Sequence, residues 1–69
     1  MDKLEYVSGI KFGNTFFKSG DDVGFKVKDD TAEYTAKLYD IGERSFIAYG
    51  DDNTEYNFCY VDIEWMKTK

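Results

Sequence analysis

The sequence predicts an all-β fold, a small antiparallel barrel preceded by an N-terminal β-hairpin. Apolar and polar residues alternate in short runs, as they do in strands that bury one face. These runs recur about every 8–12 residues, and turns rich in Gly, Asp and Asn separate them. The 69-residue length indicates a single domain, with the hairpin in residues 4–18 and the barrel in residues 23–66.

The N-terminal hairpin is predicted from two strands, residues 4–12 and residues 15–18. Apolar and polar residues alternate along the first of them. Gly13 and Asn14 stand between the two strands, and glycine at the first central position is typical of a two-residue hairpin turn. A polar loop over residues 19–22 then leads into the barrel.

Five strands are predicted for the barrel. They are residues 23–28, 33–38, 45–49, 54–59 and 63–66. In the first strand Val23, Phe25 and Val27 face one side. In the second strand the inward positions are Tyr34, Ala36 and Leu38. Polar turns join the strands, and each of the turns after the first and third strands contains two consecutive aspartates.

The segment 30–41 also fits a helix, which would make the fold α+β, with one helix packed on an antiparallel sheet. Asp30 and Glu33 have the spacing of a capping box, and Gly42 stands where such a helix would end. Thr35 and the two tyrosines of this segment favour a strand, and the neighbouring segments are strands separated by hairpin-length turns. We therefore expect a strand here.

The composition indicates how so short a chain can fold. A domain of this size buries only about 60% of its unfolded surface, but 19% of its residues are aromatic, and each aromatic ring buries a large area. A homodimer is a second way to gain stability, and Phe16, Phe17, Tyr39 and Tyr60 are candidates for its interface. With one cysteine the chain has no internal disulfide.

The charge balance indicates the class of partner. Fourteen Asp and Glu residues against nine Lys and Arg residues give a net charge of −5. This argues against direct binding of nucleic acid, which needs a basic surface, and favours a basic protein as partner. Neither a targeting segment nor an apolar run of about 18 residues is present, so we expect no membrane association and a cytoplasmic location.

Catalysis, metal binding and cofactor binding are not expected. Without histidine, the chain cannot form a Ser-His or Cys-His pair. Cys59 lies within a predicted strand, where a buried or half-buried apolar role is expected. The acidic stretch 51–55 lacks the spacing of a calcium-binding loop, and no glycine-rich phosphate loop is present. These features predict a protein that is not an enzyme.

The acidic turns are the most informative polar feature. In a meander, the turns after the first and third barrel strands lie at one end of the sheet, about 9–10 Å apart. This predicts a negative surface for a basic partner, and its residues are Asp29, Asp30, Glu33, Asp51, Asp52 and Glu55. The alternative is that these carboxylates only stabilise turns and keep the protein soluble.

The barrel stretch resembles the Tudor and SH3-like group of small barrels. The resemblance covers about two-thirds of the chain. It is carried by the Val23-x-Phe25-x-Val27 strand, Asp29-Asp30, and the stretches 33–38, 46–52 and 61–65. Tudor modules that bind methylated Lys or Arg hold the cation in an aromatic cage.

The resemblance implies a partial cage. Tyr34 and Tyr49 stand where two cage aromatics would fall, while Val27 and one of the aspartates Asp51 and Asp52 stand at the other positions. The alternative is that both tyrosines are ordinary barrel residues.

In its size, acidity and lack of histidine the chain is also similar to small host-takeover proteins of bacteriophages, some of which imitate DNA. We therefore expect a non-enzymatic acidic protein, of phage origin, that docks on a basic host protein and occludes its nucleic-acid-binding site. Two alternatives stay open. One is a Tudor-like reader or adaptor that binds a cationic side chain, and the other is a structural subunit of a larger assembly.

Overall fold

A computed structural model describes residues 3–69 of the chain. Eight strands and one 3-10 turn, η1, account for the regular structure of this part. They are β1 (Leu4–Tyr6), β2 (Ile10–Phe12), β3 (Thr15–Phe17), β4 (Asp22–Val27), β5 (Glu33–Ile41), β6 (Ser45–Tyr49), β7 (Glu55–Cys59), η1 (Tyr60–Asp62) and β8 (Ile63–Thr68). The all-β prediction is confirmed, and the helical alternative for residues 30–41 is wrong because β5 occupies this segment. No helix within residues 3–69 has the length and apolarity to cross a membrane.

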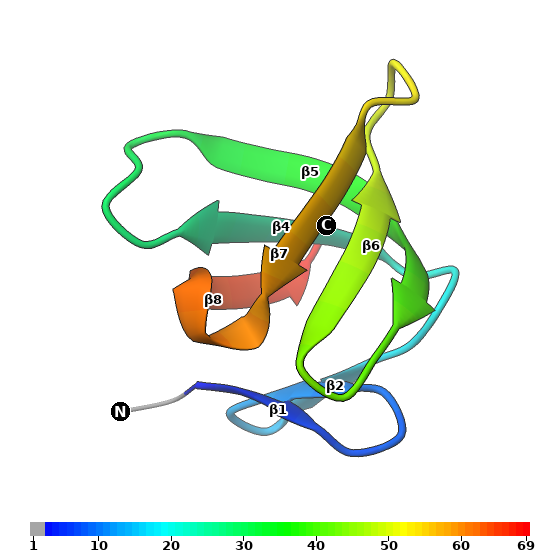
Figure 1. Ribbon diagram of the computed structural model, residues 1–69, viewed down its shortest axis with the longest axis vertical. Coiled ribbons are helices and arrows are strands. Elements are labelled where there is room, and N and C mark those ends of the chain that lie inside the picture. Colours follow the sequence, from blue (N-terminus) through cyan, green and yellow to red (C-terminus); the bar gives the residue numbers. More distant parts are fainter. Residues whose placement is uncertain (1–2) are drawn as a thin grey trace.

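The strands form two antiparallel sheets (Figure 1). The larger sheet has the order β7-β6-β5-β4-β8, and the smaller one has the order β1-β2-β3. Strand β8 returns beside β4, so the larger sheet curves round on itself and is barrel-like. Within the described residues β7 and β8 are the two ends of this order, so hydrogen bonding between strands does not close the barrel.

The predicted alternation holds along the strands of the larger sheet. Val23 and Phe25 of β4 are fully buried, and Ala36 and Leu38 of β5 face the same core. A β-bulge interrupts the β5–β6 pairing between Leu38 and Asp40. The pairing continues past the bulge to Ile41, beyond the predicted strand end at residue 38. The bulge leaves Tyr39 as an extra, exposed residue.

The N-terminal segment differs from its prediction. The single strand expected over residues 4–12 is divided at Val7–Gly9 into β1 and β2. Ser8 adopts a φ of 62°, and a Cβ atom on Gly9 would lie 2.7 Å from the Phe17 carbonyl oxygen. The tight approach of these backbones turns the chain back, giving three short strands. The predicted turn at Gly13-Asn14 is confirmed, since Gly13 has a φ of 61° and Phe12 pairs with Thr15.

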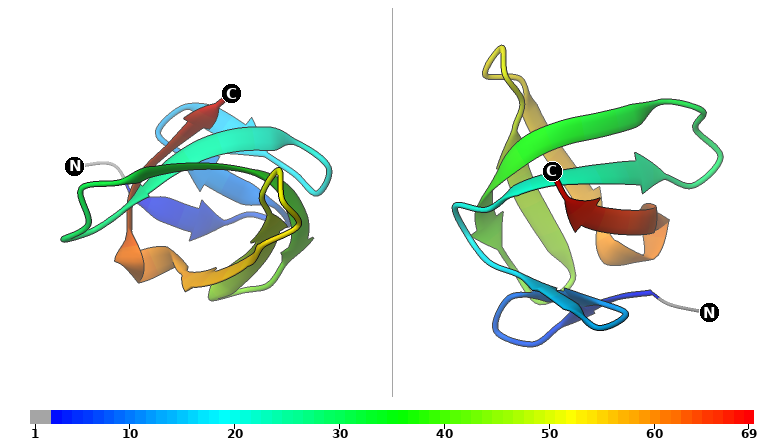
Figure 2. Two further views of the ribbon diagram at one scale, coloured as in Figure 1. Left: turned by 90° about the horizontal axis from the view of Figure 1, so that it is seen from above. Right: turned by 180° about the vertical axis from the view of Figure 1, so that it is seen from behind.

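The two sheets share one apolar core. Leu4, Ile10 and Phe17 of the smaller sheet belong to the same buried cluster as Phe25 and Phe46 of the larger sheet. Figure 2 shows the smaller sheet lying across one end of the barrel. The ring of Phe25 stacks on Tyr34 at 5.6 Å and meets Phe46 edge-on at 5.6 Å. Aromatic rings therefore fill the volume that a chain of this length would otherwise leave poorly packed.

Tyr60 joins this core to the loop before β6. Its ring is buried, and its hydroxyl donates a hydrogen bond to the Gly42 carbonyl oxygen. Burial is the main cause that raises the pKa of Tyr60 to about 12. The neutral phenol is thus the form that fits this position.

Candidate functional site

The β4–β5 turn uses its two aspartates differently. Asp30 Oδ1 accepts a hydrogen bond from the Ala32 N–H at 3.0 Å, and Asp30 Oδ2 accepts one from the Tyr34 hydroxyl at 2.7 Å. These bonds, the Ala32 one first, lower the pKa of Asp30. Asp29 is exposed and adopts a φ of 65°. Asp30 thus holds the turn, while Asp29 presents its charge to solvent.

The β6–β7 turn repeats this division. Asp52 Oδ1 accepts a hydrogen bond from the Thr54 N–H at 3.1 Å, and hydrogen bonds from the Thr54 side chain and backbone lower the pKa of Asp52. Asn53 has a φ of 63°. Asp51 is exposed. In both doublets the second aspartate holds the turn. The first aspartate also has an N–H two residues on, so the sequence carries no signal that separates the two roles.

The two glutamates of the predicted surface open the returning strands. Glu33 is exposed and lies opposite Lys26 in the β4–β5 pairing. Glu55 is exposed and lies opposite Tyr49 in the β6–β7 pairing. Glu55 Oε1 accepts a hydrogen bond from the Tyr49 hydroxyl at 3.1 Å, and this bond is the main cause that raises the pKa of Tyr49.

The curvature of the sheet separates the two turns. Figures 1 and 2 show the β4–β5 turn and the β6–β7 turn projecting from different corners of the molecule. The six predicted carboxylates therefore form two groups of three, one at each turn. The twist between neighbouring strands accumulates across the sheet. The sequence prediction, which placed both turns at one end, used a flat meander without this twist.

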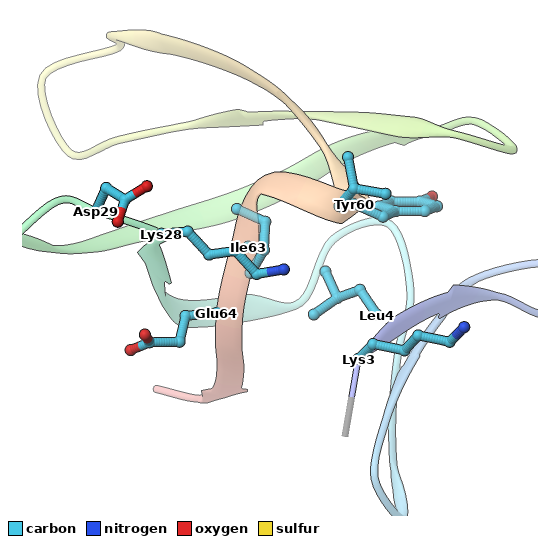
Figure 3. A pocket seen from close by; sticks show the side chains of 8 residues that line it. Lys3, Leu4, Lys28, Asp29, Tyr60, Ile63 and Glu64 are labelled. Atoms are coloured by element: carbon cyan, nitrogen blue, oxygen red, sulfur yellow. The ribbon is translucent and has the colours of Figure 1, made fainter. Parts of the chain in front are cut away.

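The group at the β4–β5 turn lies among basic side chains. Asp29 lines a hollow of about 390 Å³ together with Lys28, Glu64 and Lys3. Figure 3 shows Lys28, Asp29 and Glu64 on one side of this hollow and Lys3 on the other. This turn therefore presents a mixed surface and not a purely acidic one.

The group at the β6–β7 turn has fewer cations near it in sequence. Asp51 lines a separate hollow of about 200 Å³ with Asp22, Tyr49 and the two lysines Lys37 and Lys69. The stretch 45–66, which includes the hairpin, contains no Lys or Arg, and its five carboxylates are Asp51, Asp52, Glu55, Asp62 and Glu64. Within residues 3–69 the one ion pair is Lys26 Nζ–Glu64 Oε2 at 3.2 Å. The charges on the hairpin itself are thus not neutralised by an ion pair.

The two tyrosines of the predicted partial cage do not meet. Tyr34 shares the inner face with Ala36 and Leu38, whereas Tyr49 lies next to Ala48, which faces inward, and therefore points outward. The tyrosine beside Tyr34 is Tyr56, at 5.3 Å between ring centroids. Rings at this separation touch each other, so no cation fits between them.

Tyr49 has a different aromatic partner, Tyr39. The two rings meet edge-on, with 5.3 Å between centroids and 78° between planes. The sequence pattern pointed to Tyr49 but did not pair it with Tyr39. Alternation places both side chains on the outer face, but only the β5–β6 pairing brings the two rings together.

Other exposed side chains correct two expectations. Cys59 is exposed and not buried, because the inner positions of β7 belong to Tyr56 and Phe58. Of the four candidates for a dimer interface, Phe17 and Tyr60 are buried, whereas Phe16 and Tyr39 are exposed. Within residues 3–69 no three His, Cys, Asp or Glu side chains are grouped closely enough to hold a metal ion.

Comparisons with family models, with curated proteins and with solved structures find no match for this chain.

Proposed function

We propose that this protein is a non-enzymatic binding module that docks its acidic β6–β7 hairpin on a basic protein. The observation that carries the proposal is the hairpin itself, which projects from the body of the molecule (Figure 1). Its exposed carboxylates are Asp51, Asp52 and Glu55. The stretch 45–66 contains no Lys or Arg, and the lysines nearby, Lys37 and Lys69, lie at the hollow beside Asp51. A projecting acidic element can enter a basic groove that a flat surface cannot reach.

The second group of carboxylates has a smaller role in this proposal. Asp29 is adjacent to Lys28, and Glu33 lies opposite Lys26. These lysines reduce the attraction of a cationic partner to the β4–β5 turn. We assign the main contact to the hairpin and a supporting contact to Asp29, Asp30 and Glu33.

The mechanism is competitive occupation of the basic groove. Exposed charges speed the encounter of two proteins, and salt screens them over about 8–10 Å. Duplex DNA carries one charge per about 1.7 Å of its axis, so one hairpin replaces only a short length of its backbone. A phage protein that imitates DNA would have to displace DNA from a host DNA-binding protein. The hairpin alone is too short for this, so displacement depends on further contacts or on a dimer.

We also propose the SH3-like or Tudor-like form for the barrel. A curved antiparallel meander whose last strand returns beside its first, after the short turn η1, supports this assignment. Such folds host many functions, so the proposed binding role rests on the charges of the hairpin and not on the fold.

The test is capture of basic proteins from a host lysate by two triple variants of matched charge. One carries D51N, D52N and E55Q, and the other carries D29N, D30N and E33Q. Asparagine keeps one acceptor oxygen, so the two variants retain the bonds from the Ala32 and Thr54 N–H groups. D30N gives up the second oxygen, which accepts from the Tyr34 hydroxyl. Exposed ion pairs contribute about 0.5 kcal/mol each, so we expect the hairpin variant to bind about tenfold more weakly.

The second variant and the salt dependence complete the test. We expect a smaller loss for the β4–β5 variant, and binding by the wild type should fall steeply as salt is raised. Equal capture by the wild type and the hairpin variant would refute the proposal. Addition of duplex DNA to the captured complex then measures whether the protein and DNA compete for the same groove.

A further inference from the structure

The tyrosine pair, an exposed Tyr39 and a half-buried Tyr49, forms an aromatic surface outside the core. Tyr39 is 63% exposed, and its ring meets Tyr49 edge-on at 5.3 Å. In an edge-on pair the edge of one ring meets the face of the other, so the ring that contributes its edge keeps both of its negative faces turned away from its partner. This surface lies on the outer side of the larger sheet, opposite to buried Phe25 and to the partly buried Tyr34 and Tyr56 that pack with it.

The backbone holds Tyr39 in this position. The bulge between Leu38 and Asp40 leaves Tyr39 as an extra, unpaired residue in its strand, on the outer face that alternation after Leu38 gives it. The Ser19 hydroxyl donates a hydrogen bond to the Tyr39 carbonyl oxygen at 2.6 Å. A contact from a loop twenty residues away in sequence thus fixes the backbone at the bulge.

Both carboxylates and lysines adjoin the tyrosine pair. Glu55 accepts a hydrogen bond from the Tyr49 hydroxyl at 3.1 Å, and Asp51 lines the same hollow as Tyr49. Asp40 follows Tyr39 in the bulge and is exposed. The cations of this region are Lys37, which lies opposite Tyr49, and Lys69. The aromatic surface therefore adjoins the acidic hairpin.

We propose that the tyrosine pair receives an arginine side chain of the basic partner, and this inference rests on the proposed function of the hairpin. A guanidinium stacks on an aromatic face and also pairs with a carboxylate through two parallel hydrogen bonds. The ammonium of lysine is a point charge that is strongly hydrated and lacks the planar face. Rings beside Glu55 and Asp51 thus select arginine over lysine, whereas carboxylates alone attract both.

The test uses the full chain, titrated with an oligo-arginine peptide and with an oligo-lysine peptide of the same length. A cation–π contact at an exposed site corresponds to about a two- to fivefold change in affinity. We expect the wild type to bind the arginine peptide more tightly than the lysine peptide. In the Tyr39→Leu variant the ratio of these two affinities should be two- to fivefold smaller. Phe16→Leu is the matched control, because Phe16 is 66% exposed on the smaller sheet, and it should keep the full preference.

Further outcomes separate the two proposals. Unchanged preference in Tyr39→Leu, with both peptides bound, would overturn the arginine inference and leave the acidic hairpin intact. Absence of binding by either peptide would overturn both. Tyr39→Phe keeps the ring and should behave as the wild type, which would tie the effect to the aromatic face and not to the hydroxyl.

Discussion

At the scale of single residues, the paired aspartates show how neighbouring carboxylates divide between structure and surface. Asp30 and Asp52 each accept a hydrogen bond from an N–H two residues on, whereas Asp29 and Asp51 are exposed. The sequence predicted that both doublets lie in turns and form part of a negative surface for a basic partner. It treated the four aspartates as equivalent, although only the side chain of the second one in each pair accepts a hydrogen bond from the turn backbone.

Replacement of Asp30 by asparagine should reduce the sensitivity of the protein to acid. The pKa of Asp30 is lowered in the folded state, mainly by the Ala32 N–H. Its carboxylate therefore contributes stability above the unfolded pKa of about 3.9, and this stability is lost as the pH falls through the lower folded pKa. Urea unfolding at a series of acidic pH values should show a shallower loss of stability for Asp30→Asn than for the wild type.

The companion variant for this measurement is Asp30→Ala. It removes the acceptor as well as the charge, so it should be less stable than Asp30→Asn at neutral pH, where the asparagine oxygen still serves the turn. A wild-type acid profile in Asp30→Asn would contradict the assigned role of the carboxylate.

At the scale of elements, backbone contacts decide where strands begin and end. The break between β1 and β2 depends on Gly9, whose missing side chain allows the Phe17 carbonyl oxygen to approach. The bulge in β5 similarly depends on contacts with β6 and with the loop that contains Ser19. Neither feature has a distinct sequence pattern. Alternation of apolar and polar residues continues through residues 4–12, and no residue type near Tyr39 marks the bulge.

Gly9→Ala should destabilise the fold by about 1–3 kcal/mol. A Cβ atom there would lie 2.7 Å from the Phe17 carbonyl oxygen, and this oxygen belongs to the backbone and cannot rotate away. Gly24→Ala is the control, since its Cβ would meet the Lys67 side chain at 3.6 Å, an ordinary contact. Chemical denaturation of both variants gives the comparison, and equal stability would show that the β1–β2 turn can shift at little cost.

At the scale of the whole molecule, the smaller sheet and the barrel-like sheet depend on each other. Ile10 of β2 is fully buried in the cluster that contains Phe25 and Phe46 of the larger sheet. A domain of 69 residues has only a small margin of stability. The two sheets should therefore unfold together, in a single transition.

Ile10→Ala tests this dependence. Removal of a buried isoleucine side chain beyond Cβ typically costs about 2–5 kcal/mol, which is a large part of the stability of a small domain. We expect amide hydrogen exchange to quicken in β4 and β5 as much as in β2. Protection that is lost only in β1, β2 and β3 would mean that the smaller sheet is an independent unit.

The sequence alone determined the class of the fold and most strand positions, because alternation and turn residues are local properties of the chain. Strand β6 has the predicted ends, and β4, β5 and β7 begin within one residue of theirs. The same local properties determined that Asp30 and Asp52 lie in turns, and they predicted the acidic character of the candidate site.

Only the tertiary structure decided which side chains meet. Tyr34 lies against Tyr56 and not beside Tyr49, and Tyr49 lies against Tyr39. The two acidic turns project from different corners, because strand twist accumulates across the curved sheet. Sheet register, bulges and twist arise from contacts between segments distant in sequence. These contacts decide which tyrosines and aspartates lie together on the surface.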